Sequence, residues 1–116
     1  MNVLIRYMIP ATASRTSYVY SVQRYADGMF FDFKRNVFRP SGNTLSRDNK
    51  GQMFGRGRAS VANFDHMEEG EKYVIRIYDA KRDTLLVAVS TVGPSQSLFR
   101  QNSPQHLGRL DIHHEG

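Results

Sequence analysis

The sequence predicts an all-β protein built as an antiparallel β-sandwich. Apolar residues recur at every second position on both sides of the polar break at residues 80–83: first Tyr73, Ile75 and Ile77, then Leu85, Val87 and Val89. Successive side chains of a strand point to opposite faces, so this pattern is typical of a β-hairpin. Similar short runs precede it, turn residues separate them, and no long run has the 3.6-residue period of a helix. A sandwich or small barrel accounts for this arrangement.

The hairpin of residues 71–92 follows several shorter predicted strands. Val3, Ile5 and Tyr7 give a first strand, which ends before Pro10 because proline lacks the N–H that a strand donates. Two runs rich in aromatic residues come next, and the turn at residues 26–28 joins them, with Gly28 free to adopt a positive φ. We expect Phe31 and Phe33 to face the core. Shorter strands are expected at residues 37–39 and from residue 58 to residue 61.

The length and composition indicate one domain with a polar extension. The chain has 116 residues and no cysteine, so neither disulfides nor thiolate zinc sites contribute to its stability. No apolar segment approaches the length needed to cross a bilayer, and we expect no membrane contact. We expect residues 1–92 to form the sandwich domain and residues 93–116 to form a C-terminal extension.

Positive charge is concentrated in one segment. Residues 34–58 hold seven basic residues against one acidic residue, so this segment carries a net charge of +6, whereas the whole chain carries +5. Residues 41–57 are polar and rich in glycine, which predicts a long loop. Guanidinium groups on a flexible backbone suit phosphate or carboxylate, so nucleic acid and an acidic protein surface both fit. The predicted partner-binding residues here are Lys34, Arg35, Arg39, Arg47, Lys50, Arg56 and Arg58.

The last 24 residues are predicted to form an extended arm that packs on a neighbouring subunit, and a disordered tail is the alternative. Their sizeable apolar residues are too sparse for a second core, yet they are sufficient for docking. Pro94 and Pro104 restrict the path of the chain and disfavour a continuous helix. The predicted docking residues of the arm are Leu98, Phe99, Leu107, Leu110 and Ile112.

No motif for catalysis, cofactor binding or metal binding stands out. His113 and His114 are adjacent, so on an extended chain they point in opposite directions, away from a shared metal ion. Asp65 and His66 resemble an acid–base pair, but no nucleophile or oxyanion motif accompanies them. We therefore expect a protein that is not an enzyme, with no catalytic, cofactor or metal site.

The order of these segments resembles small β-sandwich proteins of tailed-bacteriophage virions, including capsid decoration proteins and tail or fibre-base modules. The resemblance lies in the strand YVYSVQRY, the aromatic strands MFFDF and NVF, the long polar insertion, and the strand EGEKYVIRIYD with its partner DTLLV. Immunoglobulin-like and transthyretin-like sandwiches share this layout, and no functional residue carries over.

The resemblance implies a non-enzymatic structural protein located in the virion. The leading expectation is a capsid cement or decoration subunit that contacts other virion proteins, such as the major capsid protein, and forms a homo-oligomer. A tail, neck or baseplate component, or a small basic β-barrel that binds RNA or DNA, is the alternative.

Overall fold

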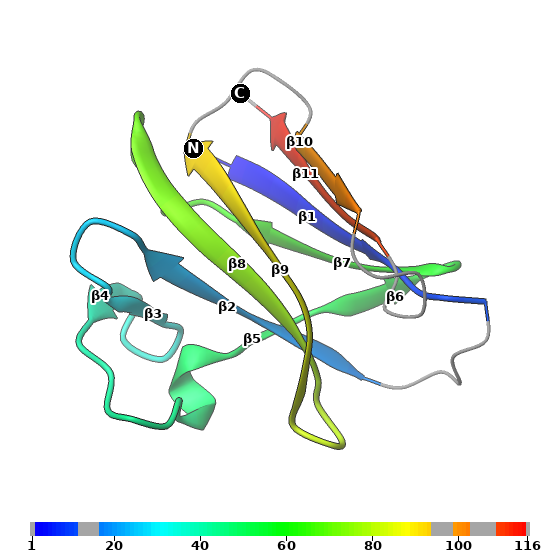
Figure 1. Cartoon of the computed structure of the whole chain (residues 1–116), viewed down its shortest axis with the longest axis horizontal. Coiled ribbons are helices and arrows are strands. Elements are labelled where there is room, and N and C mark those ends of the chain that lie inside the picture. The colour runs from blue at the N-terminus through cyan, green and yellow to red at the C-terminus, as the bar shows by residue number, and fades with distance from the viewer. Residues whose placement is uncertain (1, 12–16, 94–98, 103–108, 116) are drawn as a thin grey trace.

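The computed structural model describes residues 2–11, 17–93, 99–102 and 109–115, and it confirms the predicted all-β class. Two antiparallel sheets pack on one another as a sandwich (Figure 1). The more specific expectation of an immunoglobulin-like fold stays a prediction. The elements are β1 (Asn2–Met8), β2 (Tyr18–Arg24), β3 (Phe30–Asp32), β4 (Val37–Arg39), the 3-10 helix η1 (Arg47–Asn49), β5 (Gly51–Gln52), β6 (Phe54–Arg56), β7 (Ala59–Phe64), β8 (Glu71–Asp79), β9 (Thr84–Gly93), β10 (Phe99–Asn102) and β11 (Arg109–Glu115).

The two sheets have distinct strand orders. The first sheet runs β10-β11-β1-β7-β6, and the second runs β4-β3-β2-β8-β9, with β5 paired to β2 beside that path. Strands β8 and β9 form the predicted hairpin, and β8 also pairs with β2 over seven register positions, from Tyr18 opposite Asp79 to Arg24 opposite Tyr73. Within the described residues, the edges of the sheets are therefore β10, β6, β4 and β9.

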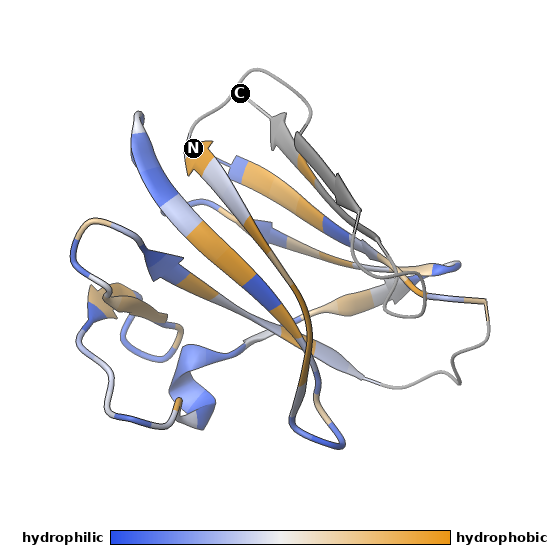
Figure 2. Cartoon of the chain, in the orientation of Figure 1, coloured by the Kyte–Doolittle hydropathy of each residue, from blue (hydrophilic) through white to orange (hydrophobic). Residues whose placement is uncertain are grey.

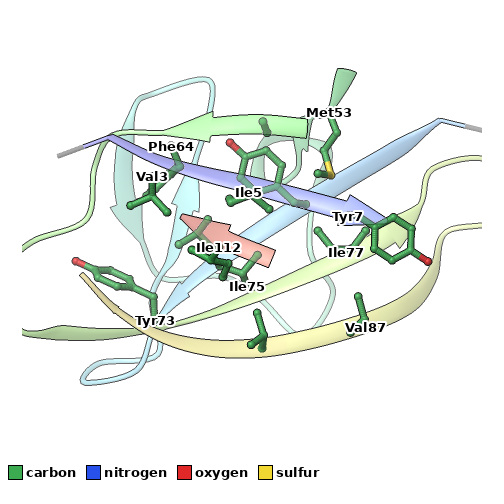
Figure 3. Packing of buried hydrophobic residues seen from close by; sticks show 14 of the residues in the cluster. Val3, Ile5, Tyr7, Met53, Phe64, Tyr73, Ile75, Ile77, Val87 and Ile112 are labelled. Atoms are coloured by element: carbon green, nitrogen blue, oxygen red, sulfur yellow. The ribbon is translucent and has the colours of Figure 1, made fainter. Parts of the chain in front are cut away.

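The core lies between the sheets, and the predicted alternation fills it. Four residues are fully buried at 0% exposure, and Tyr7 is buried at 1%; the four are Ile5, Tyr73, Ile75 and Ile77. Figure 3 shows side chains from β1, β8 and β9 meeting in this layer. Aromatic rings close one end of the core, where Phe31 packs edge-to-face on Phe64 with the ring centroids 4.9 Å apart.

One position of the predicted hairpin does not follow the alternation. Leu85 was expected on the face of Val87 and Val89, but it is 51% exposed. The register shifts between Ile77 and Tyr78, where Tyr78 lies opposite Leu85. This β-bulge adds one residue to β9, so Leu86 packs against the core in place of Leu85.

The segment predicted as a long loop is more structured than expected. It contains η1, β5 and β6, and Met53 between the last two is buried at 4% exposure. Gly51 lies against the rings of Tyr20 and Phe33, so close that a Cβ atom would come within 2.6 Å of Tyr20. The glycine permits this approach, and the sequence gives no local sign of it.

The prediction that residues 93–116 leave the sandwich as an arm is wrong for the described part of this segment. Strand β11 pairs with β1 over seven register positions, from Asn2 opposite Glu115 to Met8 opposite Arg109, and β10 pairs with β11. Ile112 lies opposite Ile5 and belongs to the core at 3% exposure. A strand that joins an existing sheet gains backbone hydrogen bonds and needs few buried side chains of its own, so the sparse apolar residues misled the prediction.

Candidate protein-binding surface

The structure divides the basic segment between two regions of the molecule. Lys34, Arg35 and Arg39 lie on the β3–β4 hairpin, with Arg47 in η1 nearby, whereas Arg56 and Arg58 lie at the β6–β7 turn. Figure 1 places the β3–β4 hairpin and the β6–β7 turn at opposite ends of the view. The seven predicted partner-binding residues therefore do not form one continuous surface.

At the first region, the buried carboxylate of Asp32 holds the turn between β3 and β4. Its oxygens accept hydrogen bonds from the backbone N–H groups of Lys34 and Arg35, and its Oδ2 lies 2.8 Å from the guanidinium of Arg35. Asn36 ends the turn with a φ of 64°. Arg39 also approaches Asp32, at 3.7 Å, so two of the predicted contact arginines neutralise a structural carboxylate.

A second turn of the same kind closes the β8–β9 hairpin. Asp79 accepts hydrogen bonds from the backbone N–H groups of Lys81 and Arg82 and lies 2.8 Å from the Arg82 guanidinium, while Asp83 has a φ of 54°. The shared sequence is Asp-x-Lys-Arg followed by Asn or Asp. This pattern occurs twice in the chain and indicates that Arg35 has a role in the turn, a role that was not predicted from the sequence.

A polar pocket of ≈ 220 Å³ lies beside the first of these turns. Arg35 and Arg39 line it together with Asp32 and Asp48, so the formal charges of these four side chains cancel. Hydrogen bonds from the Arg35 backbone hold the pKa of the Asp32 carboxyl below its ordinary value of 3.8, and the Arg35 side chain adds to this effect. A charge-balanced pocket offers little attraction to a phosphate, and its carboxylates repel one.

The two turn carboxylates predict a loss of stability in acid. Because the folded pKa of Asp32 is depressed, its contribution is complete above pH 3.8 and is lost as the pH falls through the folded pKa. Asp79 behaves in the same way: burial acts to raise its pKa, but the hydrogen bonds from Arg82 and Lys81 and the charge of Arg82 together lower it. We expect the variant Asp32→Asn/Asp79→Asn to melt at a lower temperature at pH 7 and to lose less stability than the wild type between pH 4 and pH 2. Thermal unfolding across this range measures both effects, with the exposed Glu69→Gln as control; equal acid slopes in wild type and double variant would contradict the assignment.

The remaining basic residues of the segment differ in how they are paired. Lys50 lies 2.5 Å from Asp83 and 5.0 Å above the ring of Tyr78, so it fastens the end of η1 to the β8–β9 turn. Lys34 and Arg47 are exposed and have no ion pair among the residues that the structure describes. Lys34 follows Asp32 by two positions in the β3–β4 turn, and Arg47 directly precedes Asp48.

The second region is the β6–β7 hairpin. It holds two arginines that have no ion pair among the described residues: Arg56 at the end of β6 and Arg58 in the turn. Arg56 pairs with Ala59 in the register, so Gly57 and Arg58 form the turn between the strands. Gly57 has a φ of 63° and Arg58 does not have a positive φ, which is the pattern of a type II′ turn and requires glycine at the first position. The backbone carbonyl of Arg58 accepts a hydrogen bond of 2.9 Å from Ile9, which fixes the turn to the chain after β1.

Both arginine side chains of this turn are exposed, and no ion pair reaches either of them within residues 2–11, 17–93, 99–102 and 109–115. Phe54 precedes them on the edge strand β6 and is 66% exposed. Phe54 and Arg56 lie two positions apart, so their side chains share one face of the sheet. A small pocket of ≈ 180 Å³ opens beside the turn, lined by Tyr18, Met53, Gly55 of β6 and Gly57 of the turn, among others. An exposed aromatic ring beside unpaired guanidinium groups is the composition of a binding surface for a protein.

The candidate acid–base pair of the sequence, Asp65 and His66, lies against the aromatic end of the core. The Nδ1 atom of His66 lies 2.7 Å from Asp65, but the imidazole ring packs on Phe31 with the ring centroids 4.7 Å apart. No group of three or more potential metal ligands occurs among the described residues. His113 and His114 lie in β11, as does Leu110, and Phe99 lies in β10; Leu98 and Leu107 lie outside the described residues.

None of the helical segments that the structure describes is long and apolar enough to span a bilayer. Comparisons of the chain with protein-family models, with curated proteins and with solved structures each find no match.

Proposed function

We propose that this protein is a non-enzymatic structural subunit that binds another protein through its β6–β7 hairpin. The observation that carries this proposal is the composition of that hairpin: Arg56 and Arg58 are exposed and unneutralised, and Phe54 projects beside them on an edge strand. Aromatic residues and arginines supply most of the binding energy at protein interfaces. The turn is held by the backbone of Ile9, so little conformational entropy is lost when it binds.

An acidic protein surface suits this hairpin better than nucleic acid does. Affinity for a nucleic acid depends on the number of phosphates that cationic side chains neutralise. Three cations of the basic segment, Arg35, Arg39 and Lys50, already pair with carboxylates in the described part of the chain, so they are less available to neutralise phosphates. Arginine and phenylalanine are residue types that are enriched at the centre of protein interfaces, and this hairpin exposes two arginines and one phenylalanine.

The resemblance to small sandwich proteins of phage virions gives this function its setting. In that setting the subunit is a capsid cement or decoration protein in the virion, it contacts the major capsid protein, and it assembles as a homo-oligomer. A tail, neck or baseplate component of the same build is the second candidate, supported by the same resemblance.

The test is a titration of the chain, labelled at its N-terminus, against empty shells assembled from the major capsid protein of the same genome. We expect Arg56→Ala/Arg58→Ala to weaken shell binding by about 10- to 100-fold, because arginines at an interface commonly contribute more than 1 kcal/mol each. Its melting temperature should stay close to that of the wild type, because both side chains are exposed.

The matched control is Lys34→Ala/Arg47→Ala, which removes the same charge from exposed positions at the other region. This control should bind shells almost as the wild type does. Equal weakening by both double variants would show that only net charge matters and would contradict a site at the hairpin. Unfolding of the Arg56/Arg58 variant would show that these arginines are structural.

A further inference from the structure

Strand β9 is an edge strand unlike the other three edges in the described part of the chain. It runs for ten residues, Thr84–Gly93, and contains no charged residue and no proline. The other edges, β4, β6 and β10, have three, three and four residues, and each contains an arginine. Short length and charge protect an edge strand from pairing with another chain, and β9 has neither protection. In Figure 2 it appears in orange and pale shades, after the blue turn that joins it to β8.

The hydrogen bonds of the neighbouring strands establish which backbone groups of β9 have no partner strand among the described residues. The N–H of Arg24 donates to Met29, away from β8, and the N–H of Tyr25 donates to Lys72. Arg24 and Tyr73 are register partners, so the backbone groups of Tyr73 point away from β2 and toward β9. Tyr73 lies opposite Thr91, so Thr91 exchanges hydrogen bonds with β8.

The alternation of backbone groups then places those of Ala88, Ser90 and Val92 on the free edge. The side chains of the same three residues are exposed on the outer face of the sheet, while Val87, Val89 and Thr91 are buried. Contacts at this edge therefore leave the core undisturbed. The bulge lies at the other end of the strand, near Leu85, and so the stretch from residue 87 to residue 93 is regular.

We infer that β9 pairs in antiparallel fashion with β9 of a second copy, which joins the two second sheets into one continuous sheet across a two-fold axis. In a register centred on Ser90, Ser90 lies opposite Ser90 of the second copy, and Ala88 of each copy lies opposite Val92 of the other. This register uses all three residues whose backbone groups face outward. Each such pair exchanges two hydrogen bonds, so this register forms about six of them. No like charges meet across the axis, because β9 is uncharged throughout.

A comparison of the described edge strands favours β9 of a second copy as the partner of β9. Each of the other described edges is too short to match β9 and would set an arginine against it. Pairing β9 with itself covers the one long neutral edge of each copy, so the assembly closes as a dimer and does not continue as a fibre. The inference names the strand that makes the homo-oligomer and does not depend on what the β6–β7 hairpin binds.

The first test compares Ser90→Pro with Ser90→Ala in the full chain, with sedimentation velocity over a range of concentrations. Proline removes the outward N–H of Ser90 without removing a β8–β9 hydrogen bond, a position where an edge strand tolerates proline. Two intermolecular hydrogen bonds are lost per dimer, so we expect the dissociation constant to rise about 30-fold or more. Ser90→Ala keeps the N–H and should dimerise as the wild type does.

The second test is amide hydrogen exchange of the wild type, which needs no variant to fold. The amides of Ala88, Ser90 and Val92 should become protected as the protein concentration rises, whereas those of Val87, Val89 and Thr91 should be protected at all concentrations. A wild type that stays monomeric throughout would overturn the inference. A dimer in which these three edge amides exchange freely, or which tolerates Ser90→Pro as well as Ser90→Ala, would also overturn it.

Discussion

Ile112→Asp is expected to abolish most of the folded population of the isolated chain at neutral pH. Ile112 is 3% exposed and faces Ile5 across the β1–β11 ladder, so the variant places a carboxylate in an apolar layer. An unpaired buried charge belongs to the substitutions that cost more than about 4 kcal/mol, a large part of the stability of a typical domain. Circular dichroism and urea unfolding measure the effect.

The control for this prediction is Ile112→Val, which keeps the site apolar and should cost only about 0.5–1.5 kcal/mol. If Ile112→Asp melts at the temperature of the wild type, β11 does not contribute to the core. The C-terminal segment would then be the extended arm that its composition predicts.

Ile75→Ala is expected to destabilise the protein by about 2–4 kcal/mol. Ile75 is fully buried in the middle of β8, between Val22 of β2 and Val89 of β9 in the register. Removing its outer atoms leaves a cavity that strands held on both sides cannot collapse to fill. The free energy of unfolding in urea gives the value directly.

Val74→Ala is the matched control, because Val74 is the neighbouring residue on the opposite, partly exposed face of β8. The free energy of unfolding should fall clearly less in Val74→Ala than in Ile75→Ala. Equal losses at residues 74 and 75 would mean that β8 is buried on both faces, and the two-layer arrangement would be wrong.

The sequence predicted those parts of the fold whose strands keep a strict alternation. Tyr73, Ile75 and Ile77 were predicted to share a buried face, and each is 0% exposed. Leu85 departs from its predicted face because a β-bulge is a feature of pairing between strands, and no property of residues 84–86 alone reveals it. The place of β11 was missed for a similar reason, since its backbone hydrogen bonds to β1 join residues that lie about a hundred positions apart.

The candidate site, too, was predicted from the sequence only in part. The excess of basic residues could be read directly, and Arg56 and Arg58 are exposed as predicted. The acidic partners of the other basic residues could not be located, because Lys50 meets Asp83 through the packing of η1 beside the β8–β9 turn. The repeated Asp-x-Lys-Arg turn is the one part of this pairing that the sequence does display, at Asp32 and again at Asp79.

Under the proposed function, the molecule binds protein and not nucleic acid through the β6–β7 hairpin. The most direct measurement places the wild-type chain with assembled capsid shells and, separately, with a DNA duplex of about 20 base pairs, each at about 50 and 200 mM salt. We expect the chain to sediment with the shells at both salt concentrations and to show little affinity for the duplex. Binding to the duplex that falls steeply with salt, together with no sedimentation with the shells, would contradict it.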